Sequence, residues 1–188
     1  MVEISENYAH GKASGIDMTA VASEKAIFYQ KSKGASPILA SKPFSIVVAD
    51  SGEIGHTKKA VDHVRKLRQV NQRATEAIID EIGDIVWKAK VAILTGNSLL
   101  LGRLLLDNHE YLKKMEVSNP ILDHLVEVAM RAGALGAKLT GGGMGGCIIA
   151  LSKDMLDARK IGKELTKEGA KTVWYFSTDS KDLRRMEG

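Results

Sequence analysis

Apolar residues recur along the chain with two periods, and each period predicts a type of secondary structure. Between residues 57 and 133 they recur every three or four residues, the spacing of helices with one buried face. The first predicted helix begins at residue 57, and the second covers residues 75–94. The third begins after a cap at Asn97. The fourth begins at Pro120, after a cap at Ser118 or Asn119, and ends at Gly133. A further helix covers residues 155–168 and ends at Gly169.

Apolar runs without the helical period predict strands on both sides of this helical region. FSIVVADSG, residues 44–52, is an apolar run that ends at polar residues and a glycine. Shorter runs cover residues 26–29 and 172–178. Apolar and polar residues alternate on both sides of GGGMGG, residues 141–146, which predicts a strand, a loop and a second strand.

The order of these elements predicts an α+β fold. Residues 36–188 read as strand, helices, strand, strand, helix and strand. Helices that cover one face of an antiparallel sheet are the usual arrangement of such a βαββαβ unit. SKGASP, residues 32–37, has the glycine, serine and proline of a connector, and it is the predicted domain boundary. Residues 1–35 are interpreted as the end of a preceding domain.

The composition is typical of a globular protein and limits the classes of ligand that it is expected to bind. The chain is 44% apolar, no apolar stretch reaches membrane-spanning length, and the N-terminus lacks a signal pattern, so we expect a cytoplasmic protein with no membrane partner. The net charge of +4 suits a small anion. Nucleic-acid binding is not expected, because aromatic residues make up only 5% of the chain and do not cluster with arginine. The single cysteine, Cys147, excludes an intramolecular disulfide and is expected in the core.

The glycine-rich loop at residues 141–146 is the strongest functional signal. Gly141, Gly143 and Gly146 match the letters of the dinucleotide-binding pattern G-x-G-x-x-G, but that pattern requires a following helix, and here a strand follows. A tight hairpin needs only one or two glycines, whereas backbone amides without side chains can converge on an anion. The loop is therefore predicted to bind phosphate. The alternative is that its glycines only permit close packing of the strands.

A second candidate site lies near the start of the chain, in HGKASGID, residues 10–17. The glycines of this stretch permit sharp turns that would let Ser14 and Asp17 project into a cleft. The alternatives are that Asp17 caps a following helix and that His10 is an ordinary hydrogen-bonded loop histidine.

Together these stretches resemble the mevalonate kinase family within the GHMP kinase superfamily. HGKASGIDMTA is similar to the family's catalytic-aspartate motif, and GAKLTGGGMGGCIIAL is similar to its third conserved motif. Two further stretches lie between these motifs and resemble the family in order and spacing, namely LGRLLLDNHEYL and LDHLVEVAMRAGALGAKLTG. The similarity covers nearly the whole chain, and it implies a GHMP kinase C-terminal domain at residues 36–188 and a remnant of the N-terminal domain at residues 1–35.

The resemblance also implies an activity, the transfer of the γ-phosphoryl group of ATP, with Mg²⁺, to the C5 hydroxyl of mevalonate in isoprenoid biosynthesis. It makes Asp17 the catalytic residue that accepts the hydroxyl proton, and it assigns no metal ligand to this chain. The implied mevalonate-binding residues are His10, Gly11, Ser14 and Thr57. The implied phosphate- and nucleotide-binding residues are Thr140, Gly141, Gly142, Gly143, Gly145 and Gly146.

The chain also departs from the family pattern. The family's N-terminal region, with a substrate-facing lysine and a serine loop that grips ATP, has no counterpart here, so the chain is interpreted as a C-terminal portion that is inactive alone. Met144 replaces a glycine within the loop. The expected partners are mevalonate and the missing region, in cis or in trans, and an exposed apolar face would favour a homo-oligomer. The alternatives are a non-catalytic module that binds a phosphorylated metabolite and a sister GHMP kinase, such as a phosphomevalonate kinase or a galactokinase-like enzyme.

Overall fold

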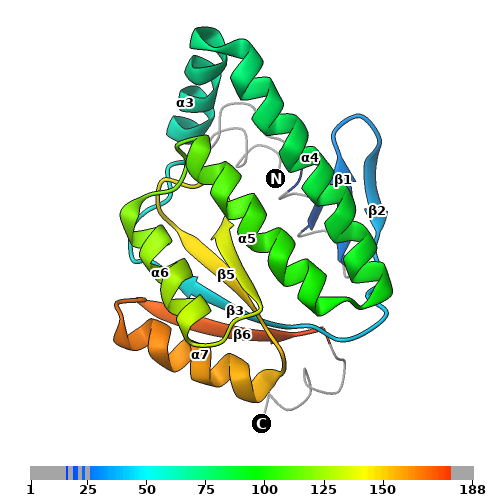
Figure 1. Cartoon of the computed structure of the whole chain (residues 1–188), viewed down its shortest axis with the longest axis vertical. Coiled ribbons are helices and arrows are strands. Elements are labelled where there is room, and N and C mark those ends of the chain that lie inside the picture. Colours follow the sequence, from blue (N-terminus) through cyan, green and yellow to red (C-terminus); the bar gives the residue numbers. More distant parts are fainter. Residues whose placement is uncertain (1–15, 17–18, 21–22, 24–25, 179–188) are drawn as a thin grey trace.

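The structure is a computed structural model, and it describes residues 16, 19–20, 23 and 26–178. Figure 1 shows its strands and helices in chain order. The strands are β1 (Ile27–Gln30), β2 (Gly34–Pro37), β3 (Ser45–Asp50), β4 (Gly136–Thr140), β5 (Cys147–Ser152) and β6 (Thr172–Ser177). The helices are α3 (Thr57–Val70), α4 (Gln72–Thr95), α5 (Ser98–Lys114), α6 (Pro120–Arg131) and α7 (Met155–Lys167).

The centre of the molecule is a 4-stranded antiparallel sheet with the strand order β4-β5-β3-β6. This arrangement confirms the predicted α+β fold and the predicted antiparallel βαββαβ unit. Within the predicted connector at residues 32–37, residues 34–37 form β2, which pairs with β1 in a separate hairpin. Gly34, at a φ of 76°, follows the turn between these strands, so its glycine character serves a hairpin rather than a linker.

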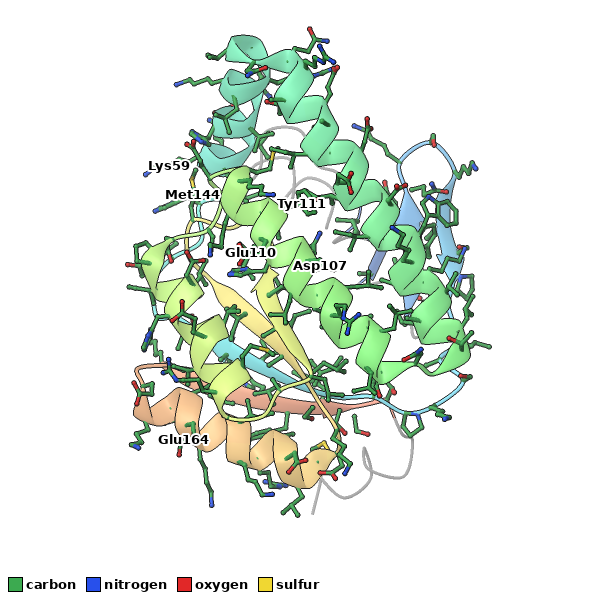
Figure 2. All side chains as sticks on the ribbon, in the orientation of Figure 1. Lys59, Asp107, Glu110, Tyr111, Met144 and Glu164 are labelled. Atoms are coloured by element: carbon green, nitrogen blue, oxygen red, sulfur yellow. The ribbon has the colours of Figure 1, made fainter. Side chains whose placement is uncertain are left out.

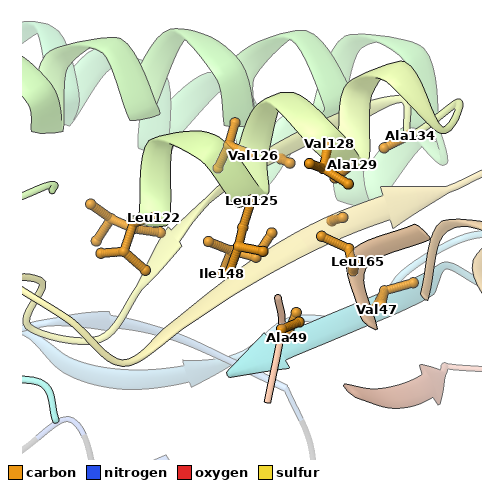
Figure 3. Close-up of a cluster of buried hydrophobic side chains, with 14 of the residues drawn as sticks. Val47, Ala49, Leu122, Leu125, Val126, Val128, Ala129, Ala134, Ile148 and Leu165 are labelled. Carbon is orange, nitrogen blue, oxygen red and sulfur yellow. The ribbon is translucent and has the colours of Figure 1, made fainter. Parts of the chain in front are cut away.

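One face of the sheet is buried under α6 and α7 (Figures 1 and 3). The register aligns two rows of side chains on this face, namely Ala137, Ala150, Val47 and Tyr175, and Leu139, Ile148, Ala49 and Val173. They pack with leucines and an isoleucine of the two helices, Leu122, Leu125, Ile161 and Leu165. The removal of these side chains from water holds the helices on the sheet.

The expectation that Cys147 lies in the core is wrong. Neighbouring residues of a strand point to opposite faces, and in β5 the residue that points into the core is Ile148, which is fully buried. Cys147 therefore lies half-buried on the other face of the sheet.

The opposite face of the sheet is covered mainly at one end. There Ile46 and Leu151 pack in a second cluster with residues of α4 and α5. Toward the other edge, Trp174 and Phe176 of β6 are 44% and 51% exposed. Large apolar side chains exposed on a sheet face are the kind of surface that another domain covers.

The long helix α5 runs along β4, an edge strand of the sheet, and the two backbones touch. A Cβ atom on Gly102 would lie 2.2 Å from the carbonyl oxygen of Leu135, and one on Gly136 would lie 1.8 Å from the carbonyl oxygen of Gly102. Both positions therefore require glycine. The contact lets α5 cover an edge that would otherwise expose unpaired backbone groups.

The helix ends largely follow the predicted capping residues. The side chains of Asn97 and Asn119 accept hydrogen bonds from the backbone three residues later, so Asn119 is the cap of α6. The second predicted helix begins earlier than expected, at Gln72, because Asn71 caps it in the same way. Within the described residues, no helix is long and apolar enough to cross a membrane.

Candidate functional site

The predicted phosphate-binding loop joins Thr140, the last residue of β4, to Cys147, the first residue of β5. Its glycines have left-handed backbone conformations at positions 141, 143, 145 and 146, with φ between 83° and 122°. Met144 also has a positive φ, 55°, which costs a residue with a Cβ atom about 1–2 kcal/mol. The path of the loop therefore depends on glycine.

Three glycines of the loop are also needed for close contact with other segments. A Cβ atom would lie 2.5 Å from Thr57 Oγ1 at Gly142, 2.3 Å from the carbonyl oxygen of Val117 at Gly143, and 2.7 Å from that of Ile54 at Gly145. Figure 2 shows Met144 near the start of α3, where Lys59 lies. The close-packing alternative thus applies to these positions, although the contacts are with neighbouring segments and not between the two strands.

Hydrogen bonds hold the far side of the loop. The amide of Met144 donates to the carbonyl of Val117 at 2.7 Å, and the amide of Gly146 donates to the carbonyl of Glu53 at 2.9 Å. Glu53 in turn accepts a hydrogen bond from the side chain of Asn119 at 2.6 Å, which links the two supporting segments. The loop is therefore held by two segments, the one that follows β3 at Glu53 and the one that precedes α6 at Val117.

The near side of the loop has amides that are available for a ligand. The backbone N–H groups of Gly141, Gly142 and Gly143 donate no hydrogen bond to any of the described residues. A Cβ atom on Gly141 would meet none of the described residues within 4 Å. Consecutive free amides of this kind form a nest that can bind an anion such as phosphate.

Thr57 lies directly against this side of the loop. It is the first residue of α3, and its hydroxyl oxygen is the nearest neighbour of the Cβ position of Gly142. His56, the residue before it, makes no side-chain capping bond to the first turn of α3. The positive end of the helix dipole, a threonine hydroxyl and the glycine amides therefore meet at one place.

The other predicted hydroxyl residue, Thr140, lies on the partly covered face of the sheet. The register places it in a row with Cys147, Asp50 and Thr172. Burial raises the pKa of Cys147, and the charge of Asp50 raises it further, so the thiol remains protonated at neutral pH. These properties do not favour a nucleophilic cysteine.

Lys138 lies two residues before Thr140 in β4 and points to the same face of the sheet. Burial lowers its pKa to about 8, because the charged ammonium group loses water. No ion pair joins this lysine to a carboxylate of the described residues. The buried charge of Lys138 therefore has no ion-pair partner among the described residues, although it lies next to the candidate site. The sequence pattern did not indicate this feature.

The remaining predicted site residues cannot be placed against the loop. His10, Gly11, Ser14 and Asp17 all lie outside the described residues. Their assignments, including the catalytic role of Asp17, remain predictions.

The sequence interpretation missed His109, which is buried beside the loop-bearing strand. It lies on α5 and is 2% exposed, and its ring nitrogen Nδ1 accepts a hydrogen bond from the Leu139 amide at 3.3 Å. Burial lowers its pKa, partly opposed by the nearby carboxylate of Asp123. The position of His109 among the apolar residues of α5 indicated that it could be buried. Its hydrogen-bonding partner and its ion-pair partner are distant in the sequence, so the sequence did not show what it contacts.

Comparison with known proteins gives this geometry a family context. Residues 89–171 match the family model described as GHMP kinases C terminal. The mevalonate kinase of Thermococcus gammatolerans is 38% identical over 154 residues, which cover 79% of this chain and 46% of that protein. The mevalonate kinase of Pyrococcus furiosus is 36% identical over 182 residues, covering 89% of this chain and 54% of that protein.

Solved structures give the same result for the fold. The crystal structure of L. major mevalonate kinase in complex with R-mevalonate matches with a TM-score of 0.85 and 32% identity, covering 92% of this chain and 54% of that chain. The chain thus spans about half the length of the relatives that it matches.

Proposed function

The chain is a relative of mevalonate kinases and has the GHMP kinase C-terminal domain fold, and from this premise we propose that it is the C-terminal portion of an enzyme that phosphorylates mevalonate with ATP. The product would be 5-phosphomevalonate. Catalysis would require the N-terminal region that precedes this portion in the relatives, supplied in the same chain or by a second one.

The observation that carries this proposal is the meeting of Thr57 with the glycine loop. These segments are far apart in the sequence, and the resemblance assigns them to the two substrates, Thr57 to mevalonate and the loop to phosphate. A Cβ atom on Gly142 would lie only 2.5 Å from the Thr57 hydroxyl oxygen. A phosphate bound to the free loop amides would therefore lie close to a hydroxyl compound bound at Thr57, as a phosphoryl transfer requires.

The proposed reaction uses this chain's residues mainly for positioning. The C5 hydroxyl oxygen of mevalonate attacks the γ-phosphorus of ATP while the bond from that phosphorus to the bridging oxygen of ADP breaks. The loop amides, the first turn of α3 and Thr140 would stabilise negative charge on the phosphate oxygens. Asp17 would accept the proton that leaves the hydroxyl group.

Mg²⁺ accompanies ATP in this proposal. In the described part of the chain, no group of three or more histidine, cysteine, aspartate or glutamate side chains is arranged so that it could hold a metal ion.

Asp17→Asn tests the proposed chemistry in the enzyme completed with the N-terminal region of a related mevalonate kinase. We expect kcat to fall by about a hundredfold or more, with the Kd for ATP nearly unchanged, because the carboxylate is needed mainly in the transition state. Steady-state kinetics and ATP titration measure the two quantities. A variant that keeps nearly full kcat would remove Asp17 from the mechanism.

A substrate panel on the same completed enzyme tests the choice of substrate. We expect phosphorylation of mevalonate in preference to phosphomevalonate and galactose. Preference for phosphomevalonate or galactose would instead identify a sister GHMP kinase. Binding of phosphorylated metabolites without phosphorylation of any of the three would identify a non-catalytic module.

A further inference from the structure

His109 connects the two segments that hold the glycine loop. Its Nδ1 atom accepts the hydrogen bond of the Leu139 amide at 3.3 Å. Leu139 directly precedes Thr140, where β4 ends and the loop begins. Since β4 is an edge strand, this amide has no strand partner on that side, and the ring supplies the missing acceptor.

The other nitrogen of the ring faces the start of α6. His109 Nε2 lies 3.1 Å from Asp123 Oδ1, within ion-pair distance, although the geometry is not that of an aligned hydrogen bond. The same oxygen of Asp123 accepts a hydrogen bond from the Ser118 hydroxyl at 2.5 Å. Ser118 follows Val117, whose carbonyl oxygen holds the amide of Met144 in the loop.

These contacts reach the loop from both directions. One runs from Nδ1 through Leu139 to Thr140, which directly precedes the loop, and the other runs from Nε2 through Asp123 to the segment that binds Met144. We propose that His109 is a positioning residue that sets where the glycine loop lies relative to Thr57. The inference rests on the proposed function, because it gives the loop's position its meaning as a phosphate site.

The ring must be neutral, with its proton on Nε2, to fill this role. In that tautomer Nδ1 is an acceptor and Nε2–H faces the carboxylate. Protonation would turn Nδ1 into a second donor that faces the donor of Leu139. The charged groups that act on the ring are Asp123 on α6 and Glu110 and Lys113 on α5. Figure 2 labels Glu110 on α5.

Two substitutions separate the contacts of the ring. In His109→Asn the side-chain oxygen can occupy the place of Nδ1 and keep the acceptor for Leu139. In His109→Gln the side-chain NH₂ can reach the place of Nε2 and keep the donor for Asp123, but the acceptor for Leu139 is lost. His124→Asn is the matched control, because His124 lies on α6 and is exposed, 3.7 Å from Glu168.

Amide hydrogen exchange on the full chain, followed by NMR, tests the inference without catalysis. In His109→Gln we expect the amide of Leu139 to exchange about tenfold faster relative to the core amide of Val47, as the loss of a hydrogen bond implies, whereas the amide of Met144, whose support runs through Asp123, stays protected. In His109→Asn we expect protection of Leu139 to be retained, and in the control no change. Equal acceleration at Val47, or no change at Leu139 in His109→Gln, would overturn the inference and leave His109 an ordinary core residue.

Kinetics of the completed enzyme provide the second readout. We expect His109→Gln to raise the KM for ATP about tenfold, with a smaller effect on kcat, and His109→Asn to restore it to within about twofold of the wild type. Equal loss of kcat in both variants, with the KM for ATP unchanged, would contradict a positioning role. If the wild-type completed enzyme shows no mevalonate phosphorylation, the proposed function fails, and the exchange experiment still decides whether His109 positions the loop.

Discussion

Single residues of the glycine loop serve two needs that the sequence does not separate. Gly142, Gly143 and Gly145 allow the loop to touch Thr57, Val117 and Ile54, where a Cβ atom would collide. Gly141 has no such neighbour among the described residues, and its left-handed backbone suits contact with a ligand. Phosphate binding and close packing, which are alternatives from the sequence alone, are therefore compatible within one loop.

The strain at Met144 is open to a direct test. Met144 has a φ of 55°, a left-handed conformation that glycine adopts without strain and alanine does not. We therefore expect the free energy of unfolding of Met144→Gly, measured with urea, to be about 1 kcal/mol higher than that of Met144→Ala. Both variants lose the same methionine contacts, so their difference isolates the backbone. Met130 in α6 is the control, where alanine should be the more stable by about 1 kcal/mol. The same order at both positions would contradict the account of Met144.

Lys138 gives a prediction that depends on pH. Its pKa falls from 10.5 to about 8 on folding, so below pH 8 the folded protein carries a poorly solvated charge that costs about 3 kcal/mol. We expect Lys138→Met to raise the free energy of unfolding at pH 7, and the gain to shrink as pH rises from 8 toward 10.5. Urea unfolding across this range measures it, with exposed Lys163 of α7 as the control substitution. A gain that does not change with pH would assign the effect to packing instead of charge.

At the scale of elements, the sequence predicts well where the signal is local. Asn97 and Asn119 cap their helices as expected, and the helical period locates the helices. The strand β2 escapes the sequence because its short polar run becomes a strand only by pairing with β1. The error at Cys147 has a related cause, since both faces of β5 carry apolar residues and the alternation does not tell which face α6 will cover.

The contact between α5 and β4 makes a prediction at this scale. Gly102→Ala would place a Cβ atom 2.2 Å from the carbonyl oxygen of Leu135, and we expect it to lower the free energy of unfolding by about 3 kcal/mol or more. Gly83→Ala is the matched control at an exposed position of α4, where a Cβ atom would meet none of the described residues within 4 Å, and it should raise stability by about 0.5–1 kcal/mol. Denaturant unfolding measures both. Similar changes in the two variants would mean that the helix is not in backbone contact with the strand.

At the scale of the whole molecule, the sequence predicts the fold and one half of the candidate site. It singles out the glycine loop and Thr57 separately, and only the fold brings them together, because the contact joins a hairpin to a helix start that is distant in the chain. His109 escapes for the same reason, since its partners come from β4 and α6. The exposed Trp174 and Phe176 agree with a molecule whose relatives are about twice its length.

The most direct measurement is mevalonate-dependent formation of ADP by this chain with and without the N-terminal region of a related mevalonate kinase. We expect negligible turnover by either part alone and clear turnover by the two together, because neither part carries the whole site. Substantial turnover by the chain alone, or none by the assembled pair despite stable association, would contradict the account.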